Sequence, residues 1–200
     1  MNYLAHLFLA QNNAESYHGN LLGDFQKGLD TENLSLKTKR ALANHILVDK
    51  FTDSHPQVKQ SKALFTAKRR RFSGIAIDVL YDHLLIKHWG QFSDCHFEEF
   101  KNNSYLLLSQ KLPIMHPPMQ KVIKNVITHD WFTQYSSFTG TAQALDNIAN
   151  RIRFKNGFHG IGIEISDHFE LLEQSFLIFF PELIEHIHYH GPEKQYGSNN

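Results

Sequence analysis

Acidic and imidazole side chains gather in two apolar segments between residues 45 and 83. In the first, NHILVDKFTDSHP, His45, Asp49 and Asp53 follow one another every four residues. A helix of about 3.6 residues per turn places such residues on one face. Carboxylates stacked on one face repel one another, and burying them without a counter-charge costs on the order of several kcal/mol. A bound cation would remove that cost, so the segment indicates a metal site.

The second segment, SGIAIDVLYDHLL, repeats this pattern. Asp78 and Asp82 again stand four residues apart, and His83 follows directly, among closely spaced Ile, Val and Leu residues. Mixed carboxylate and imidazole ligation suits Mn²⁺, Fe or Zn²⁺, whereas an all-oxygen set favours Mg²⁺ or Ca²⁺. We therefore predict a metal site between two helices. The alternative is a pair of solvated helix faces with a few capping Asp side chains.

Two further candidates precede these segments. His6 lies in the apolar opening MNYLAHLFLA, where a lone histidine is usually a core residue with satisfied hydrogen bonds. Asp24 follows Gly23 in HGNLLGDF, where the backbone can turn sharply, so a turn or N-cap role explains it equally well. Taken alone, neither residue decides between a structural and a chemical role.

A run of cations, Lys68, Arg69, Arg70 and Arg71, lies between the two acidic segments. On a helix these consecutive residues point in all directions, so a solvated surface is the ordinary explanation. A cationic patch beside an acidic metal site is also what an anionic, phosphate-bearing partner needs. The run is therefore a candidate docking surface.

The totals exclude several broad classes of function. Lys plus Arg and Asp plus Glu both number 20, so the formal net charge is zero and no global charge favours nucleic acid or a membrane surface. No uninterrupted apolar run reaches the roughly 18 residues of a membrane span, and the N-terminal stretch lacks a basic leader. The single cysteine, Cys95, cannot form an internal disulfide. We expect a cytoplasmic protein, with its oligomeric state left open.

The periodicity that must position these groups is helical throughout. No segment shows sustained period-two alternation, which predicts one all-α domain over residues 1–200, a bundle of about seven or eight helices with a polar tail of about ten residues. We read GFHGIGIE as a glycine-rich loop and His186, His188 and His190 as part of the tail. Helices are expected at residues 2–10, 35–54, 57–72, 75–90, 97–112 and 117–129, from a cap at Thr141, and at 166–187.

The motifs together carry a family resemblance. With MNYLAHLFLA, GNLLGDF, HILVDKFTDSHP, RRRFSGI and DVLYDHLL, the sequence resembles the acyl carrier protein phosphodiesterases, α-helical proteins regarded as divergent relatives of the HD metal phosphohydrolases. The resemblance covers nearly the whole chain. It implies hydrolysis of the phosphodiester that joins 4′-phosphopantetheine to a serine of holo-acyl carrier protein, in lipid metabolism. Mn²⁺ is the implied metal, with Mg²⁺ or another divalent ion as an alternative.

The resemblance also implies a role for each matching position. A bound ion would lower the pKa of a water from about 15.7 toward 7, and a histidine would protonate the leaving serine alkoxide. Two other functions stay open: an HD-like phosphohydrolase of nucleotides or other small phosphodiesters, and a non-catalytic module that binds carrier protein. The implied roles are metal ligation by His6, Asp24, Asp49 and Asp82, catalysis by Asp24, His45 and His83, orientation of the ligands by Asp53 and Asp78, and docking of the acidic carrier by Lys68, Arg69, Arg70 and Arg71.

Overall fold

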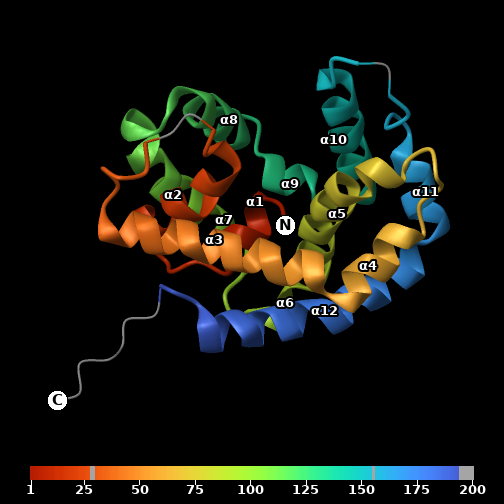
Figure 1. The fold of residues 1–200 in the computed structure, drawn as a ribbon, viewed down its shortest axis with the longest axis horizontal. Helices are drawn as coiled ribbons and strands as arrows, with labels where there is room; N and C mark the ends of the chain where they lie inside the picture. Colours follow the sequence, from red (N-terminus) through yellow and green to blue (C-terminus); the bar gives the residue numbers. More distant parts are fainter. Residues whose placement is uncertain (28–29, 155, 194–200) are drawn as a thin grey trace.

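The computed structural model describes residues 1–27, 30–154 and 156–193. Within these ranges the chain is α-helical and has no β-strand, so the all-α prediction is confirmed (Figure 1). The helices are more numerous and shorter than predicted. They are α1 (Tyr3–Phe8), α2 (Ala14–Leu22), α3 (Leu36–Ser54), α4 (Pro56–Ala63), α5 (Ser73–Lys87), α6 (Trp89–Phe92), α7 (Phe97–Lys111), α8 (Pro117–Thr128), α9 (Trp131–Gln134), α10 (Phe138–Arg151), α11 (Ile161–Asp167) and α12 (Phe169–His190), with short 3₁₀ turns η1 (Gly23–Phe25), η2 (Arg70–Phe72) and η3 (Leu112–Ile114).

The short helix α1 lies near the centre of the molecule, behind α3 and beside α5 (Figure 1). Leu4, Ala5, His6 and Leu7 are fully buried there. The N-terminus of α1 is held by a side chain of α5, because the Asp82 carboxylate accepts hydrogen bonds from the backbone N–H groups of Leu4, at 3.1 Å, and Ala5, at 3.0 Å. These amides lack partners within their own helix, so a carboxylate at this end stabilises α1.

Two glycines let α2 and η1 lie directly against α3. A Cβ at Gly19 would overlap the Ala41 side chain and come within 2.7 Å of the Thr38 carbonyl oxygen. A Cβ at Gly23 would overlap the imidazole ring of His45. Only hydrogen fits in either space, so the close approach depends on glycine at both positions. The same approach brings Asp24, the next residue of η1, over α3.

The break between α3 and α4 is the one that the sequence predicts. His55 is extended, at φ −68° and ψ 133°, and its ring nitrogen accepts a hydrogen bond from the Gln57 amide at 3.3 Å. Pro56 is the first residue of α4, where its missing N–H costs nothing. The helix that carries His45 and Asp49 therefore ends at the predicted place.

Other boundaries differ from the prediction. The helix after Pro56 ends at Ala63, so Lys68 and Arg69 lie in a turn and Arg70 begins η2. Thr141 lies one turn inside α10, whose N-cap is Ser137, because the Ser137 hydroxyl accepts from the Gly140 amide at 3.1 Å. Side-chain oxygens of this kind cap a helix at its first residue, and sequence spacing alone did not distinguish the two.

The C-terminal part contains more helix than predicted. GFHGIGIE is irregular only as far as Gly160, which has φ 72°, and α11 begins at Ile161. The last helix starts at Phe169 and continues to His190, so His186, His188 and His190 are helical and do not belong to a tail. The His186 ring stacks on Phe51 at 4.4 Å, which gives this polar turn a packing partner. Of the predicted polar tail, residues 194–200 lie outside the described residues.

The buried side chains of these helices form one continuous hydrophobic core that extends from α1 to α12. Aromatic rings of α12 fill much of it, and Phe176, Phe179 and Phe180 are fully buried. In the described ranges, none of the helices combines the length and the hydropathy that a bilayer crossing requires.

Candidate metal centre

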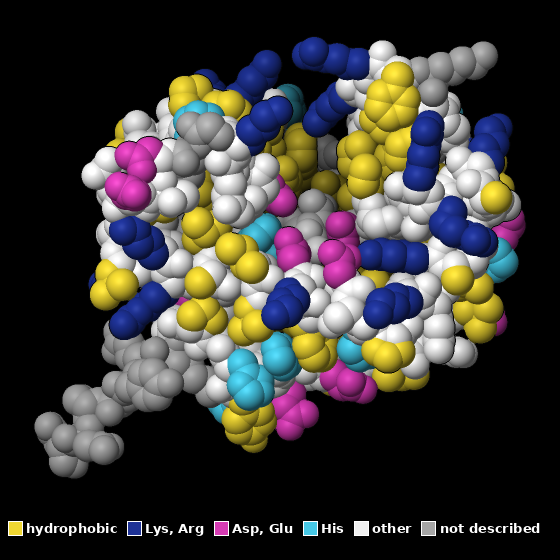
Figure 2. All heavy atoms as spheres, viewed as in Figure 1, with side chains coloured by type: hydrophobic (Ala, Val, Ile, Leu, Met, Phe, Trp, Pro, Cys, Tyr) yellow, Lys and Arg dark blue, Asp and Glu magenta, His cyan; other side chains and the backbone are white. Residues whose placement is uncertain are grey.

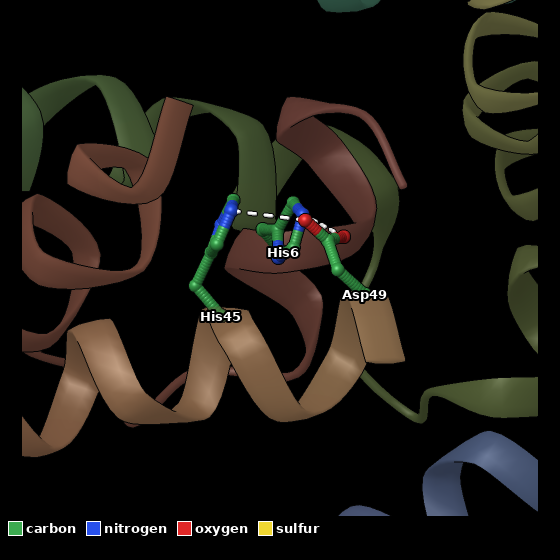
Figure 3. Close-up of side chains that lie close together, drawn as sticks. All are labelled: His6, His45 and Asp49. Atoms are coloured by element: carbon green, nitrogen blue, oxygen red, sulfur yellow. Dashed lines mark ion pairs between the residues drawn. The ribbon is translucent and has the colours of Figure 1, made fainter. Parts of the chain in front are cut away.

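Three side chains from two helices meet beside the centre of the fold. His6 comes from α1, and His45 and Asp49 come from successive turns of α3 (Figure 3). One ligand atom from each lies within 4.8 Å of the others. The Asp49 carboxylate faces both rings, with Oδ1 3.3 Å from Nε2 of His6 and Oδ2 3.1 Å from Nε2 of His45. We call this group the His6–His45–Asp49 cluster.

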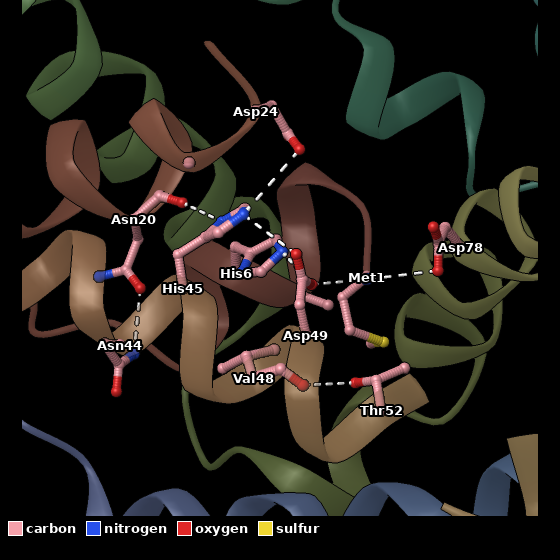
Figure 4. Close-up of polar contacts among 12 residues, drawn as sticks. Met1, His6, Asn20, Asp24, Asn44, His45, Val48, Asp49, Thr52 and Asp78 are labelled. Atoms are coloured by element: carbon pink, nitrogen blue, oxygen red, sulfur yellow. Dashed lines mark hydrogen bonds and ion pairs between the residues drawn. The ribbon is translucent and has the colours of Figure 1, made fainter. Parts of the chain in front are cut away.

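Both imidazoles are held in place before any ligand arrives. Their rings stack with centroids 4.0 Å apart and an interplanar angle of 18°. Nδ1 of His45 lies 2.7 Å from the Asn20 carbonyl oxygen, so an N–H at this position donates there and Nε2 faces Asp49 (Figure 4). His6 is fully buried; among the described residues its Nε2 has only the Asp49 contact at 3.3 Å, which is not a hydrogen bond, and its Nδ1 has no hydrogen-bond partner. An unpartnered buried polar atom is costly, and a cation supplies the missing partner.

The electrostatics of His6 and Asp49 favour the protonation states that bind metal, whereas His45 would have to lose a proton to the ion. Burial lowers the pKa of His6 to about 3, so its imidazole is neutral at pH 7. Burial alone would raise the pKa of Asp49, but contacts with His45, His6 and the N-terminal ammonium hold it well below its usual range. Burial alone would lower the pKa of His45, but the Asp49 carboxylate outweighs this effect and raises the pKa. A neutral imidazole and an ionised carboxylate are the forms that ligate a metal ion.

Asp24 stands at the edge of the cluster. Its Oδ1 lies 4.0 Å from Nε2 of His45 (Figure 4). The side chain is 40% exposed, yet the surrounding protein excludes enough water to raise the pKa of its carboxyl above the ordinary value. Asp49 is 39% exposed, whereas His45 is almost completely buried. The group is therefore closed on the imidazole side and open to solvent on the carboxylate side, where Figure 2 shows acidic side chains at the middle of the face.

The N-terminal amino group is a member of the site that side-chain spacing does not reveal. The Met1 ammonium lies 3.1 Å from Oδ1 of Asp49 and 3.2 Å from Oδ1 of Asp78, and so links α3 to α5 (Figure 4). Burial would lower its pKa, but the two carboxylates raise it to about 10. The Asn20 carbonyl was missed for the same reason: a backbone group carries no signal in the sequence.

Besides Asp24, four of the predicted residues lie outside the cluster. Asp82 is fully buried and bonded to the first amides of α1, so it supports the helix that carries His6, and burial raises its pKa to about 7. Nδ1 of His83 lies 2.7 Å from the Tyr135 carbonyl oxygen, between the rings of Phe138 and Phe169.

Asp53 points to solvent and pairs with Lys62 at 2.7 Å. Asp78 reaches the site only through the Met1 ammonium. The helix period also separates Asp82 from His83, because consecutive residues on a helix point about 100° away from one another.

The four residues of the cationic turn, Lys68 to Arg71, differ in how far their side chains are bound to the rest of the protein. Arg69 is tied down, with its guanidinium donating to the carbonyl oxygens of Gly157 and His159 and pairing with Glu164 at 3.0 Å. Arg71 lies over the Phe72 and Phe154 rings, at 4.5 Å and 5.3 Å from their centroids. Lys68, Arg70 and Arg71 are exposed. The turn therefore presents several charges to solvent on a backbone that Arg69 fastens.

Comparison with known proteins places the chain in a family. The family model described as acyl carrier protein phosphodiesterase matches residues 1–183. The chain belongs to this family. Relatives named acyl carrier protein phosphodiesterase include those of Yersinia pestis, 32% identical over 92% of this chain and 96% of the relative, and of Escherichia coli O45:K1 (strain S88 / ExPEC), 29% identical over the same shares. No solved structure matches, so the expected relationship to HD phosphohydrolases stays a prediction.

As a member of the acyl carrier protein phosphodiesterase family, the chain has a donor set that fits a divalent metal ion. His6, His45 and Asp49 would hold it, because two imidazole nitrogens and one carboxylate oxygen converge there and the His6 nitrogens lack other partners. Such an ion, when bound, lowers the pKa of a water toward about 7 and polarises a phosphoryl oxygen. These are the effects that phosphodiester hydrolysis needs.

Proposed function

We propose that this protein hydrolyses the phosphodiester between 4′-phosphopantetheine and a serine of holo-acyl carrier protein, releasing apo-carrier and free phosphopantetheine in the cytoplasm. The observation that carries the proposal is the His6–His45–Asp49 cluster. It lies in a chain that matches most of the length of relatives named for this activity. Mn²⁺ is the metal we propose, with Mg²⁺ or another divalent ion as alternatives, because mixed imidazole and carboxylate donors suit Mn²⁺.

Asp24 is the group we propose as proton acceptor from the attacking water. It stands at the open side of the cluster, and its raised pKa makes it a better base than an ordinary carboxylate. Nε2 of His45 lies 4.0 Å from the Asp24 carboxylate, and we propose that it orients this carboxylate. We assign no proton transfer to His83, because its Nδ1 contacts the backbone carbonyl of Tyr135, the residue directly after α9.

Docking of the carrier is the role we propose for the cationic turn. Carrier proteins are acidic, and exposed cations next to a binding site act mainly on the rate and orientation of encounter. Lys68, Arg70 and Arg71 are the exposed members, while Arg69 holds the turn to the segment before α11. The proposal therefore assigns the charge contacts to these three residues.

The test is an intact-mass assay of the carrier. Metal-stripped protein is incubated with holo-acyl carrier protein, with and without Mn²⁺, and the carrier mass is followed. Loss of one phosphopantetheine only when Mn²⁺ is present is the expected result. An unchanged carrier under every metal, with the protein folded by circular dichroism, would contradict the proposal. A parallel assay on a small phosphodiester without carrier separates it from a general phosphohydrolase.

A further inference from the structure

A cavity of about 280 Å³ lies between α8, α9 and α10. Figure 2 shows this region as a hollow between α8 and α10, with Lys and Arg side chains around its rim. Small-molecule sites usually enclose about 300–1,000 Å³, so this one suits a slender ligand better than a bulky ring system. Neither the His6–His45–Asp49 cluster nor the cationic turn contributes to its walls.

The walls combine amide groups with apolar surface. Asn125, Gln134 and Asn147 bring side-chain amides, and the Trp131 ring and Ile148 bring apolar surface. Gln134 uses its amide N–H on the His129 carbonyl oxygen, which leaves its own oxygen free to accept. The Asn125 side chain makes no hydrogen bond with any other described residue. The Asn147 oxygen accepts from the Gln143 amide at 3.3 Å, which leaves the Asn147 N–H groups free to donate. The free donors and acceptors of these amides suit a ligand that itself carries amide groups.

Arg151 stands at the rim with its charge uncommitted. In the described part of the chain its guanidinium has no ion pair or hydrogen bond, and its contact is with the Trp131 ring, at 5.7 Å from the centroid. A guanidinium matches the geometry of phosphate oxygens with two parallel hydrogen bonds. The rim of the cavity is therefore prepared for an anion.

One aromatic side chain connects the cavity with the metal centre. Tyr3 stacks on Trp131, with ring centroids 6.4 Å apart. Burial raises the pKa of the Tyr3 phenol, the Asp24 carboxylate raises it further, and Arg151 opposes the shift, so both charges act on this phenol. Tyr3 is also the first residue of α1, the helix that carries His6, so α1 joins the cavity wall at Trp131 to the metal centre.

We propose that this cavity receives the pantetheine arm while the phosphodiester lies at the metal centre. The assignment rests on the proposed function. Beyond its phosphate the arm carries a gem-dimethyl group, a hydroxyl, two amides and a thiol, in a slender chain. Arg151 faces the phosphate end, Trp131 packs against the gem-dimethyl group, and the Asn125, Gln134 and Asn147 amides pair with those of the arm. Arg71 of the cationic turn contacts Phe154, a few residues beyond Arg151, so a carrier docked on the turn lies beside the cavity mouth.

The first experiment fills the cavity without removing any polar group. Ala144 lines the wall on α10, and Ala144→Phe would occupy the space of the arm. Asn150→Phe is the matched control, since Asn150 is exposed on the same helix outside the cavity. Metal-stripped protein is titrated with free 4′-phosphopantetheine and with pantetheine, and the fluorescence of Trp131 reports binding. Trp131→Phe identifies the signal, because Trp89 lies elsewhere in the core.

We expect Ala144→Phe to weaken binding of both compounds by at least about tenfold, and Asn150→Phe to change it by less than about twofold. Arg151→Gln, an exposed substitution that leaves the core intact, should weaken phosphopantetheine binding but hardly affect pantetheine. Equal binding in wild type, Ala144→Phe and Arg151→Gln overturns the proposal, as does the absence of a Trp131 response in wild type.

The carrier-mass assay on the same proteins separates this inference from the proposed function. Hydrolysis by wild type with unchanged KM in Ala144→Phe would show that the arm does not bind in the cavity, while the proposed function would stand. No hydrolysis, together with pantetheine binding that Ala144→Phe abolishes, would retire the function and keep the cavity as a pantetheine site. A raised KM in Ala144→Phe, with Asn150→Phe normal, supports both.

Discussion

Asp49 is the residue on which the charges of the site converge. Its carboxylate faces two imidazoles and the N-terminal ammonium within 3.3 Å. Asp49→Asn keeps the shape and removes the charge, so we expect divalent-metal affinity and carrier hydrolysis to fall by at least about 100-fold. Manganese binding by calorimetry and the carrier-mass assay measure the two effects.

Asp53→Asn provides the comparison, because Asp53 follows Asp49 at the same spacing but pairs with Lys62 in solvent. We expect both metal affinity and hydrolysis to change by less than about twofold in this variant.

His6 makes stability depend on pH in a defined direction. Burial lowers its pKa to about 3, against 6.5 for the free side chain, so the unfolded chain binds this proton over that interval and the folded protein does not. The stability contributed by neutral His6 is present above pH 6.5 and is lost as pH falls toward 3, by at most about 1.4 kcal/mol per unit. His45, whose pKa is raised, acts oppositely and loses its contribution as pH rises above 6.5.

Urea unfolding of metal-stripped protein between pH 6.5 and 4 tests this sign. The ordinary pKa of Asp49 is 3.8, so that carboxylate contributes only near the acidic end of the interval. Asp82, whose raised pKa of about 7 stabilises the fold toward acid, is present in both proteins, so the prediction concerns their difference. As pH falls, we expect the free energy of unfolding of wild type to decrease relative to that of His6→Phe, whose ring keeps the stack on His45. Parallel slopes in the two proteins would show that His6 does not remain neutral in the fold.

At the scale of elements, the site depends on how closely η1 approaches α3. A Cβ at Gly23 would overlap the His45 ring, so Gly23→Ala must displace either the ring or η1 with Asp24. We expect a loss of about 1–3 kcal/mol in the free energy of unfolding, typical of overpacking, and a fall in Mn²⁺ affinity of at least about tenfold.

Gly90→Ala is the matched control for this prediction. Nothing lies within 4 Å of a Cβ at Gly90, and the residue is helical, so alanine there should be neutral or slightly stabilising. Urea denaturation and Mn²⁺ titration of both variants give the comparison. If Gly23→Ala bound Mn²⁺ as tightly as Gly90→Ala, the prediction would be wrong, and the His45 ring would have more space than the structure shows.

At the scale of the whole molecule, net charge is zero and charge placement decides the encounter. Reversing Lys68 and Arg71 to Glu should raise KM for holo-carrier severalfold at low salt, flatten its salt dependence and leave kcat unchanged, because both side chains are exposed. Steady-state kinetics at several salt concentrations measures this. Lys37→Glu with Arg40→Glu changes the net charge equally at the start of α3, at the other side of the molecule in Figure 1, and should leave KM as it is. The same response to both pairs would indicate a nonspecific field effect.

Arg69 is expected to behave differently from its neighbours. Its guanidinium joins the cationic turn to Gly157, His159 and Glu164, so Arg69→Glu removes these bonds and leaves Glu164 facing another carboxylate. We expect a lower melting temperature together with any change in KM. Differential scanning calorimetry distinguishes this structural effect from the kinetic effect of Lys68 and Arg71.

The sequence alone was sufficient for the family, the all-α class and the shared helix face of His45 and Asp49. His45 and Asp49 are four residues apart, and an i, i+4 spacing turns by only about 40° on a helix, so they share a face wherever the helix lies. His55-Pro56 ends that helix because the residue before proline avoids helical dihedrals. These outcomes depend on local geometry, which adjacent residues carry.

Only the tertiary structure decided which of the spaced acids join the cluster. Eight residues turn a helix by about 80°, so Asp53 rotates away from His45, and His6 of α1 meets α3 at His45 and Asp49. Asp82 and His83 are neighbours in sequence, yet one holds the N-terminus of α1 and the other the Tyr135 carbonyl. Spacing along a helix determines the direction of a side chain on that helix, but what it meets depends on which helix crosses there, and that is a property of the packed fold.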